Sequence, residues 1–300
     1  MKNINFDIPK TYFLLSTILT ILVVVFFVGF IFYTGFPVLN KEGMGFLTGT
    51  SFNYDTGEYG IFIFLAGTLI VTVVTMVIAC PLSILSAIYL AEYAPSWLEN
   101  IMRPMIELLV GIPSVVYGIF GLFMLQGIFR YYINPSISAV LGFIPIFYYD
   151  PSSDGLGVLL ASTVLAIMIL PTITIITQES IRSVPKELRE ASFALGSTKW
   201  ETIKKLLIPT ASSGILTAII LGIMRAMGET MAIVMLLGNS PKVPSTIFDH
   251  GYAMTSKILN DIGHYVSMDD PRSALFAVAA VLFMIEILFV ASIRLVSRKN

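Results

Sequence analysis

The sequence predicts an all-α membrane protein with six transmembrane helices. Of its 300 residues, 56% are hydrophobic and only 12% are charged, and the mean hydropathy is +0.86. Soluble domains carry about 25% charged residues, so composition excludes an ordinary soluble globule. A transmembrane helix needs about 20 consecutive apolar residues, and the sequence contains six runs of that length.

The six predicted spans lie at about residues 12–36, 62–90, 106–129, 156–177, 212–237 and 274–296. Lys2 and Lys10 precede the first run, as basic residues precede a secretory signal. That run is too long for a signal core of about 7 to 15 residues. We therefore expect a short N-terminal segment (1–11) and one transmembrane domain (12–300), without an internal repeat or a soluble domain.

The basic residues predict that both termini are cytoplasmic, because cytoplasmic loops are rich in Lys and Arg. With the N-terminus inside, twelve of the 18 basic residues fall on the cytoplasmic side. These are Lys2, Lys10, Arg103, Arg182, Lys186, Arg189, Lys199, Lys204, Lys205, Arg294, Arg298 and Lys299. The outer loops hold five: Lys41, Arg130, Lys242, Lys257 and Arg272. Arg225 lies within a span.

A polar segment, residues 183–209, separates the fourth and fifth runs and predicts a helix, a turn and a second helix. Ser183 and Pro185 indicate the start of the first helix, and Gly196 indicates its end. Thr198 with Glu201 three residues later forms a capping box that begins the second helix. Pro209 then leads into the fifth span.

The same segment resembles the EAA loop of ABC-importer membrane subunits. It has Glu190, Ala191 and Ser192, then Gly196 after three residues, and nine residues later Leu206-Leu207-Ile208-Pro209. Ser192 replaces the usual Ala, and the closing aliphatic residues are exchanged. The resemblance implies a cytoplasmic loop that couples to an ATPase; the alternative is an ordinary amphipathic hairpin between two spans.

Charged residues in the apolar runs are candidates for function, because they are costly in a bilayer. Arg225 and Glu229 are spaced i, i+4, so on a continuous helix they share a face and can pair. Either the two charges neutralise each other, or Arg225 faces a pathway and binds an oxyanion, with Glu229 weakening the grip. Thr230 belongs to the same segment, and Gly228 predicts close approach of another backbone.

Two further acidic residues, Glu107 and Glu286, lie in or beside the apolar runs, and the sequence indicates their roles less directly. Glu107 precedes the sequence Gly111 to Gly118, in which Pro113 predicts a break or a close helix crossing, supported by hydrogen bonding of the Ser114 hydroxyl. Packing is the expected role of Glu107, Pro113 and Ser114, with a place in the pathway as the alternative. Glu286 lies near the middle of the last run, and we expect it to pair with another helix or subunit.

The sequence argues against several classes of site and function. A net charge of −1 argues against a nucleic-acid partner. Neither His250 nor His264 belongs to a metal-binding pattern, and Cys80 is the only cysteine. No Gly-Lys dipeptide occurs, so the chain has no phosphate-binding loop for ATP. An intramembrane enzyme is disfavoured, because H-E-x-x-H, G-x-S-x-G and histidines within the spans are all lacking.

As a whole the chain resembles the PstC family of permease subunits. The resemblance rests on residues 46–69 (FLTGTSFNYDTGEYGIFIFLAGTL), 87–95 (AIYLAEYAP), 111–118 (GIPSVVYG), the EAA loop and 225–239 (RAMGETMAIVMLLGN). The related PstA subunit typically has Ala-Pro after Gly-Glu-Thr, where this chain has Met231-Ala232. The last helix, with Glu286 and Ala291, departs from the family, which puts its packing partners in doubt.

This resemblance implies a type I ABC importer permease in the cell membrane, with inorganic phosphate as the cargo and Arg225, Glu229 and Thr230 as candidate pathway residues. Its implied partners are a PstA-like permease, two copies of an ATPase subunit and an extracytoplasmic phosphate-binding protein. ATP and magnesium would bind to the ATPase, and this non-catalytic chain would bind no cofactor. A PstA role, another oxyanion such as sulfate or molybdate, and a stand-alone channel or secondary transporter remain alternatives.

Overall fold

The computed structural model describes residues 8–297, which form two compact units. The first unit contains the described residues up to Ile61 together with Asn260–Phe283. The second contains Phe62–Leu259 and the described residues from Met284 onward. The predicted N-terminal segment falls mostly on residues 1–7, which lie outside the described residues, as do Arg298 and Lys299.

The first unit packs one long helix against the beginning of another. α1 (Ile8–Glu42) is followed by α2 (Gly45–Thr48) and by a hairpin of β1 (Phe52–Asn53) and β2 (Glu58–Tyr59). The strands are antiparallel, with Phe52 opposite Tyr59. Gly35 allows α1 to approach the first half of α15 (Asp269–Ser297), because a Cβ there would lie 2.7 Å from the backbone nitrogen of Ala277.

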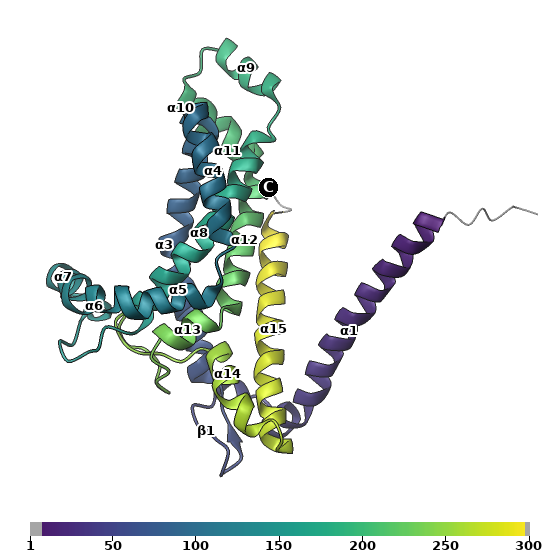
Figure 1. Cartoon of the computed structure of the whole chain (residues 1–300), viewed down its shortest axis with the longest axis vertical. Helices are drawn as coiled ribbons and strands as arrows, with labels where there is room; N and C mark the ends of the chain where they lie inside the picture. The colour runs from purple at the N-terminus through teal and green to yellow at the C-terminus, as the bar shows by residue number, and fades with distance from the viewer. Residues whose placement is uncertain (1–7, 298–300) are drawn as a thin grey trace, which may run out of the picture. The chain divides into compact units, whose positions relative to one another are not determined.

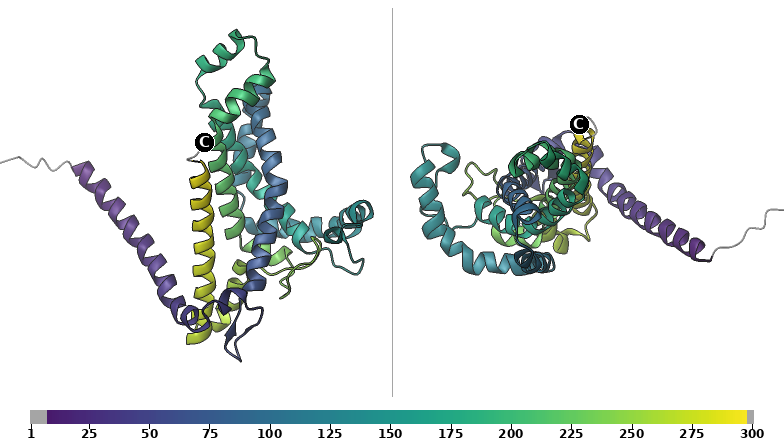
Figure 2. Two further views of the ribbon diagram at one scale, coloured as in Figure 1. Left: turned by 180° about the vertical axis from the view of Figure 1, so that it is seen from behind. Right: turned by 90° about the horizontal axis from the view of Figure 1, so that it is seen from above.

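Three long helices form the core of the second unit and run side by side (Figures 1 and 2). They are α3 (Phe62–Ile88), α8 (Val158–Arg182) and α12 (Ser212–Gly228). Membrane helices associate through small residues and interhelical hydrogen bonds. Accordingly, the hydroxyl of Ser162 donates to the carbonyl of Val71 over 3.2 Å, and Gly222 lies against Ile173.

The remaining elements of the second unit extend or connect these helices. Before α8 they are η1 (Tyr89–Tyr93), α4 (Ser96–Val110), α5 (Ser114–Phe120), η2 (Gly121–Leu125), α6 (Gln126–Ile128), η3 (Phe129–Ile133), α7 (Asn134–Leu141) and η4 (Pro145–Phe147). After α8 they are α9 (Lys186–Ala194), α10 (Lys199–Thr202), η5 (Ile203–Leu207), α11 (Ile208–Thr210), α13 (Met231–Leu236) and α14 (Met254–Tyr265), whose last residues belong to the first unit.

Within residues 8–297, five helices are long and apolar enough to cross a membrane, and a bent pair supplies a sixth span. The five are Pro9–Glu42, Phe62–Tyr93, Ser114–Leu141, Val158–Arg182 and Asp269–Ser292. The bent pair joins Lys199–Thr210 to Ser212–Gly228 at 69°. The predicted six-span all-α fold is confirmed. Two predicted spans differ most: the third begins at Ser114, after a break at Gly111–Pro113, and continues to Leu141, and the fifth ends at Gly228.

Candidate functional site

The hairpin formed by α9, α10 and the turn between them is the first candidate site, and we call residues 186–202 the coupling hairpin. It lies at one end of the α3, α8 and α12 bundle (Figure 1). α9 begins after Pro185, as predicted, whereas Ser183 caps the end of α8. Gly196 ends α9 in the left-handed region, with φ of +82°. A Cβ there would meet no atom within 4 Å, so backbone conformation alone requires glycine.

The predicted capping box at Thr198 is present. The backbone N–H of Glu201 donates to Thr198 Oγ1 over 3.3 Å, and the backbone N–H of Thr198 donates to Glu201 Oε2 over 3.0 Å. These bonds satisfy two donors that the start of a helix leaves open. The backbone hydrogen bond from Thr198, followed by the bond from its hydroxyl, lowers the pKa of Glu201.

Ion pairs and hydrogen bonds fasten the coupling hairpin to the neighbouring helices. The guanidinium of Arg189 donates to the carboxylate of Glu92 in η1 and, over 2.7 Å, to the carbonyl of Ile181 in α8. The side chains of Arg189 and Glu92 are only 19% and 11% exposed. The hydroxyls of Ser192 and Thr202 lie 2.9 Å apart and join the two arms. The hairpin is therefore held by η1, which follows α3, and by the C-terminal end of α8.

Four large apolar side chains of the coupling hairpin remain uncovered. They are Leu188, Phe193, Leu195 and Trp200, and Leu195 is 87% exposed. Glu190 and Ala191 are also exposed on α9. Pro209 lies beyond the hairpin in α11, next to the 69° bend. Several exposed large apolar groups on one short polar segment are typical of protein interfaces. The sequence motif identified the hairpin, but it gave no sign that these side chains stay uncovered.

α4 forms a second set of ion pairs with the C-terminal end of α8. Glu99 accepts from Arg182, and this bond lowers the pKa of Glu99. Arg103 donates to Glu107 over 3.0 Å and to Glu179 over 2.8 Å. Glu107 was predicted at the start of the third span. It lies instead on an exposed face of α4, because the break at Gly111–Pro113 separates α4 from the apolar helix that follows.

The predicted break at Pro113 is present, and so is a close helix crossing. α4 ends at Val110 and α5 begins at Ser114. Gly118 packs against α13, since a Cβ there would lie 2.8 Å from Met235 Sδ. Within residues 8–297 the Ser114 hydroxyl makes no hydrogen bond. The hydroxyl of Tyr117 bridges the break instead, donating to the carbonyl of Leu109 over 3.0 Å.

The second candidate site is the end of α12, where the predicted pair between Arg225 and Glu229 is not formed. α12 ends at Gly228, and Glu229 has extended backbone angles, φ −69° and ψ 133°. The two residues therefore do not share a helical face. Arg225 Nη1 donates to Thr172 Oγ1 over 3.3 Å, while Glu229 Oε1 accepts from the backbone N–H of Ala232 over 3.3 Å. Among the described residues, no carboxylate forms an ion pair with Arg225.

Hydrogen bonds hold the extended backbone between α12 and α13. Thr255 Oγ1 on α14 donates to the carbonyl of Glu229 over 2.8 Å, and Thr230 Oγ1 donates to the carbonyl of Gly228 over 3.3 Å. Among the described residues no backbone approaches Gly228, contrary to prediction: a Cβ there would meet only Glu286 Oε1, at 3.7 Å. Glu286 therefore lies beside the break in the fifth span, and it has no ion-pair partner in the part of the chain that the structure describes.

Thr172 and Thr255 are the members of this site that sequence reasoning missed. Both are threonines in apolar or mixed helices, and their partners lie 53 and 26 residues away. A hydroxyl within a membrane span is a signal of interhelical hydrogen bonding, but it does not identify the partner. No group of three or more potential metal ligands occurs within the described residues. His250 Nε2 instead lies 2.8 Å from Asp154 Oδ1.

Residues 79–300 match the family described as binding-protein-dependent transport system inner membrane component. The chain is 38% identical, over 88% of its length and 81% of the relative, to the probable ABC transporter permease protein YqgH of Bacillus subtilis. It is 36% identical to the phosphate transport system permease protein PstC of Xylella fastidiosa, over 84% of the chain and 78% of the relative.

A solved structure shares the fold. It is that of a bacterial ABC transporter involved in the import of the acidic polysaccharide alginate, with 15% identity and a TM-score of 0.59, covering 98% of this chain and 97% of that one. At this identity the likeness concerns the fold alone, and it is the fold of a type I ABC importer permease.

Proposed function

The chain belongs to the family of binding-protein-dependent transport system inner membrane components, and on this basis we propose that it forms half of the pathway of an ATP-driven importer of inorganic phosphate. As an ABC importer permease subunit it is a non-catalytic, multi-pass protein of the inner membrane. Phosphate as the cargo is supported by 36% identity to proteins named as phosphate transport system permease PstC.

The observation that carries the phosphate assignment is the environment of Arg225, whose charge is not neutralised by a carboxylate among the described residues. Its guanidinium is partly buried at the end of α12, and its hydrogen-bond partner, Thr172, is neutral. A guanidinium stays protonated and presents paired N–H donors that match two phosphate oxygens. A positive charge without a carboxylate partner among the described residues is suited to a passing anion. Thr230 and the backbone around Glu229 complete the proposed contact region.

Release of the anion has a physical basis in the same geometry. A pathway residue must bind weakly enough for its cargo to leave. Thr172 occupies part of the donor capacity of Arg225. The carboxylate of Glu229 lies at the break and repels an anion that stays. This arrangement replaces the pairing with Glu229, by which the sequence-based hypothesis of a pathway weakened the grip of Arg225.

The proposed partners are a second, PstA-like permease, a dimer of ATPase subunits that binds ATP and magnesium, and an extracytoplasmic phosphate-binding protein. The chain itself binds no cofactor. Both termini are cytoplasmic in this proposal, which places the coupling hairpin on the ATPase side. Leu188, Phe193, Leu195 and Trp200 would be covered by an ATPase subunit. ATP-driven closure would then shift the hairpin and, through Arg189 and Glu92, the adjoining spans.

The test is transport by the purified complex of both permeases and the ATPase in proteoliposomes, with the binding protein supplied. We expect uptake of radiolabelled phosphate that requires ATP and is unaffected by excess sulfate or molybdate. Uptake of sulfate or molybdate in place of phosphate would assign another oxyanion. Phosphate movement through the chain alone, without an ATPase, would overturn the importer.

A further inference from the structure

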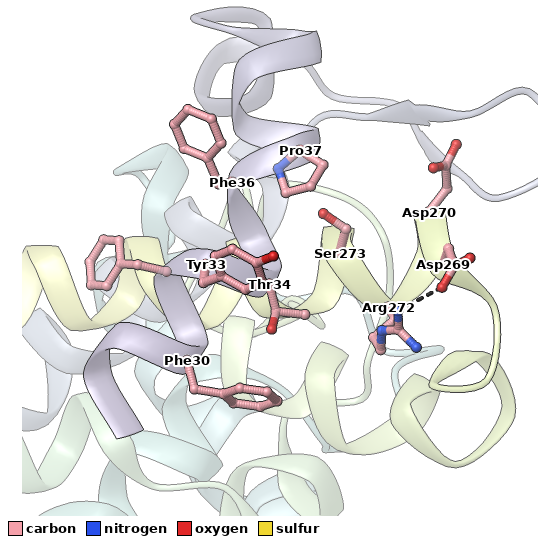
Figure 3. Close-up of a pocket in the computed structure, with 10 residues that line it drawn as sticks. Phe30, Tyr33, Thr34, Phe36, Pro37, Asp269, Asp270, Arg272 and Ser273 are labelled. Atoms are coloured by element: carbon pink, nitrogen blue, oxygen red, sulfur yellow. Dashed lines mark hydrogen bonds and ion pairs between the residues drawn. The ribbon is translucent and has the colours of Figure 1, made fainter. Parts of the chain in front are cut away.

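The first unit contains a cavity of about 1040 Å³ between the C-terminal half of α1 and the start of α15. Aromatic side chains of α1 form its wall, among them Phe30, Tyr33 and Phe36 (Figure 3). Tyr33 and Phe36 are exposed in the chain by itself. A cavity of this size accommodates a headgroup and the first part of its acyl chains, and aromatic residues are enriched at the level of lipid headgroups.

The charged side chains of this cavity lie together on the first turn of α15. They are Asp269, Asp270 and Arg272, as Figure 3 shows. Arg272 Nη2 donates to Asp269 Oδ1 over 2.6 Å. Asp270 lies 4.0 Å from Lys41 and its side chain is 72% exposed, so its oxygens are accessible to further donors. One guanidinium and two carboxylates therefore line the same cavity as the aromatic side chains of α1.

We propose that this cavity binds a phospholipid whose headgroup carries a primary ammonium, as phosphatidylethanolamine does. The ammonium donates to Asp270, the phosphate accepts from Arg272, and the acyl chains lie along Phe30 and Phe36. Charge complementarity selects this headgroup. A choline group has no N–H to donate, and a purely anionic lipid has no cation to place against Asp270. This inference is independent of the cargo that the importer carries.

Tryptophan quenching by brominated lipids tests the proposal on the full chain in nanodiscs. The two native tryptophans, Trp97 and Trp200, lie outside the first unit. Tyr33→Trp therefore places a reporter in the cavity, and Phe27→Trp is the matched reporter on α1 outside it. We expect brominated phosphatidylethanolamine to outcompete brominated phosphatidylcholine at Tyr33→Trp by roughly tenfold or more, the effect of one charge-assisted hydrogen bond. The Phe27→Trp reporter should show equal quenching by both.

A second variant identifies the headgroup contact. Asp270→Asn in the Tyr33→Trp background should abolish the preference, whereas Asp55→Asn, in the hairpin region outside the cavity, should keep it. Equal quenching by the two lipids at Tyr33→Trp would reduce the cavity to ordinary lipid contact and overturn the proposal. Absence of lipid quenching at Tyr33→Trp, with normal quenching at Phe27→Trp, would show that protein fills the cavity and would also overturn it.

Discussion

Arg225 donates to the hydroxyl of Thr172 across 3.3 Å, from the end of α12 to α8. The contact joins the fourth and fifth spans at the place where the fifth span ends. It also leaves the positive charge of Arg225 without a carboxylate partner among the described residues. The proposed phosphate pathway depends on this relationship, and it yields a direct test.

Replacing Arg225 by Gln should reduce the initial rate of phosphate uptake at least about tenfold, because a charge-assisted hydrogen bond is removed along with the charge. Arg225→Lys should restore only part of the rate, since an ammonium cannot bind two oxygens in the paired geometry of guanidinium. Uptake by phosphate-starved cells measures both variants. Thr172→Val should have a smaller, few-fold effect.

Arg103→Gln is the matched control for Arg225→Gln. Arg103 is also bonded to α8, through Glu179, but it lies on α4 outside the proposed pathway. Its replacement should leave the affinity for phosphate unchanged. Undiminished uptake by Arg225→Gln, with normal amounts of assembled complex, would remove Arg225 from the pathway.

Substitution of Gly196 should weaken attachment of the ATPase through backbone strain alone. With φ at +82° and no atom within 4 Å of a Cβ, Ala fits the space but costs roughly 1–2 kcal/mol in the left-handed conformation. Asn tolerates that conformation better, so the order Gly, Asn, Ala is expected for the amount of ATPase that copurifies. Equal copurification across the series would mean that the turn does not set the shape of the docking surface.

The capping box makes the start of α10 sensitive to acid. The lowered pKa of Glu201 means that its stabilising contribution is complete above the ordinary value of 4.5 and is lost as pH falls through the folded-state pKa below it. Amide hydrogen exchange in α10 should therefore accelerate, beyond its intrinsic pH dependence, below about pH 4.5. Glu201→Gln should remove that extra dependence.

Thr198→Ala should weaken the same helix start by about 1 kcal/mol, seen as roughly fivefold faster exchange in α10. Thr210→Ala is the control, because Thr210 lies in α11 and its hydroxyl makes no hydrogen bond within the described residues. Identical exchange in the two variants would contradict a stabilising role for the box.

Breaking the partly buried contact between Arg189 and Glu92 should loosen the coupling hairpin. Arg189→Ala leaves the carboxylate of Glu92 with little exposure and without its guanidinium. Loss of one partner costs about 3–5 kcal/mol in a fully buried pair, and less is expected for this partly buried one. Uptake should fall although the chain still inserts into the membrane. Lys205→Ala, which breaks the exposed pair with Glu201, should change little. Exchange of the two charges in one double variant should recover part of the activity.

The features that the sequence predicted correctly are set by neighbours in the chain. Gly196, Thr198 and Glu201 act within one turn, so their spacing alone predicts the hairpin. The apolar runs predict spans because hydrocarbon thickness fixes their length. The end of α12 at Gly228 was missed, because the apolar residues of α13 continue the run without a break in composition. Thr172 was missed because its contact with Arg225 depends on how two separate helices pack.

Two glycines in the spans should respond differently to the same substitution. A Cβ on Gly67 would lie 2.2 Å from the carbonyl oxygen of Tyr252, a backbone atom that cannot rotate away. Gly67→Ala should therefore destabilise the chain by about 1–3 kcal/mol through overpacking. On Gly228 the nearest atom to a Cβ is Glu286 Oε1 at 3.7 Å, an ordinary contact. Thermal unfolding in detergent should place Gly228→Ala near the parent chain and Gly67→Ala well below it. The reverse order would contradict both the close approach of Tyr252 to Gly67 and the open space beside Gly228.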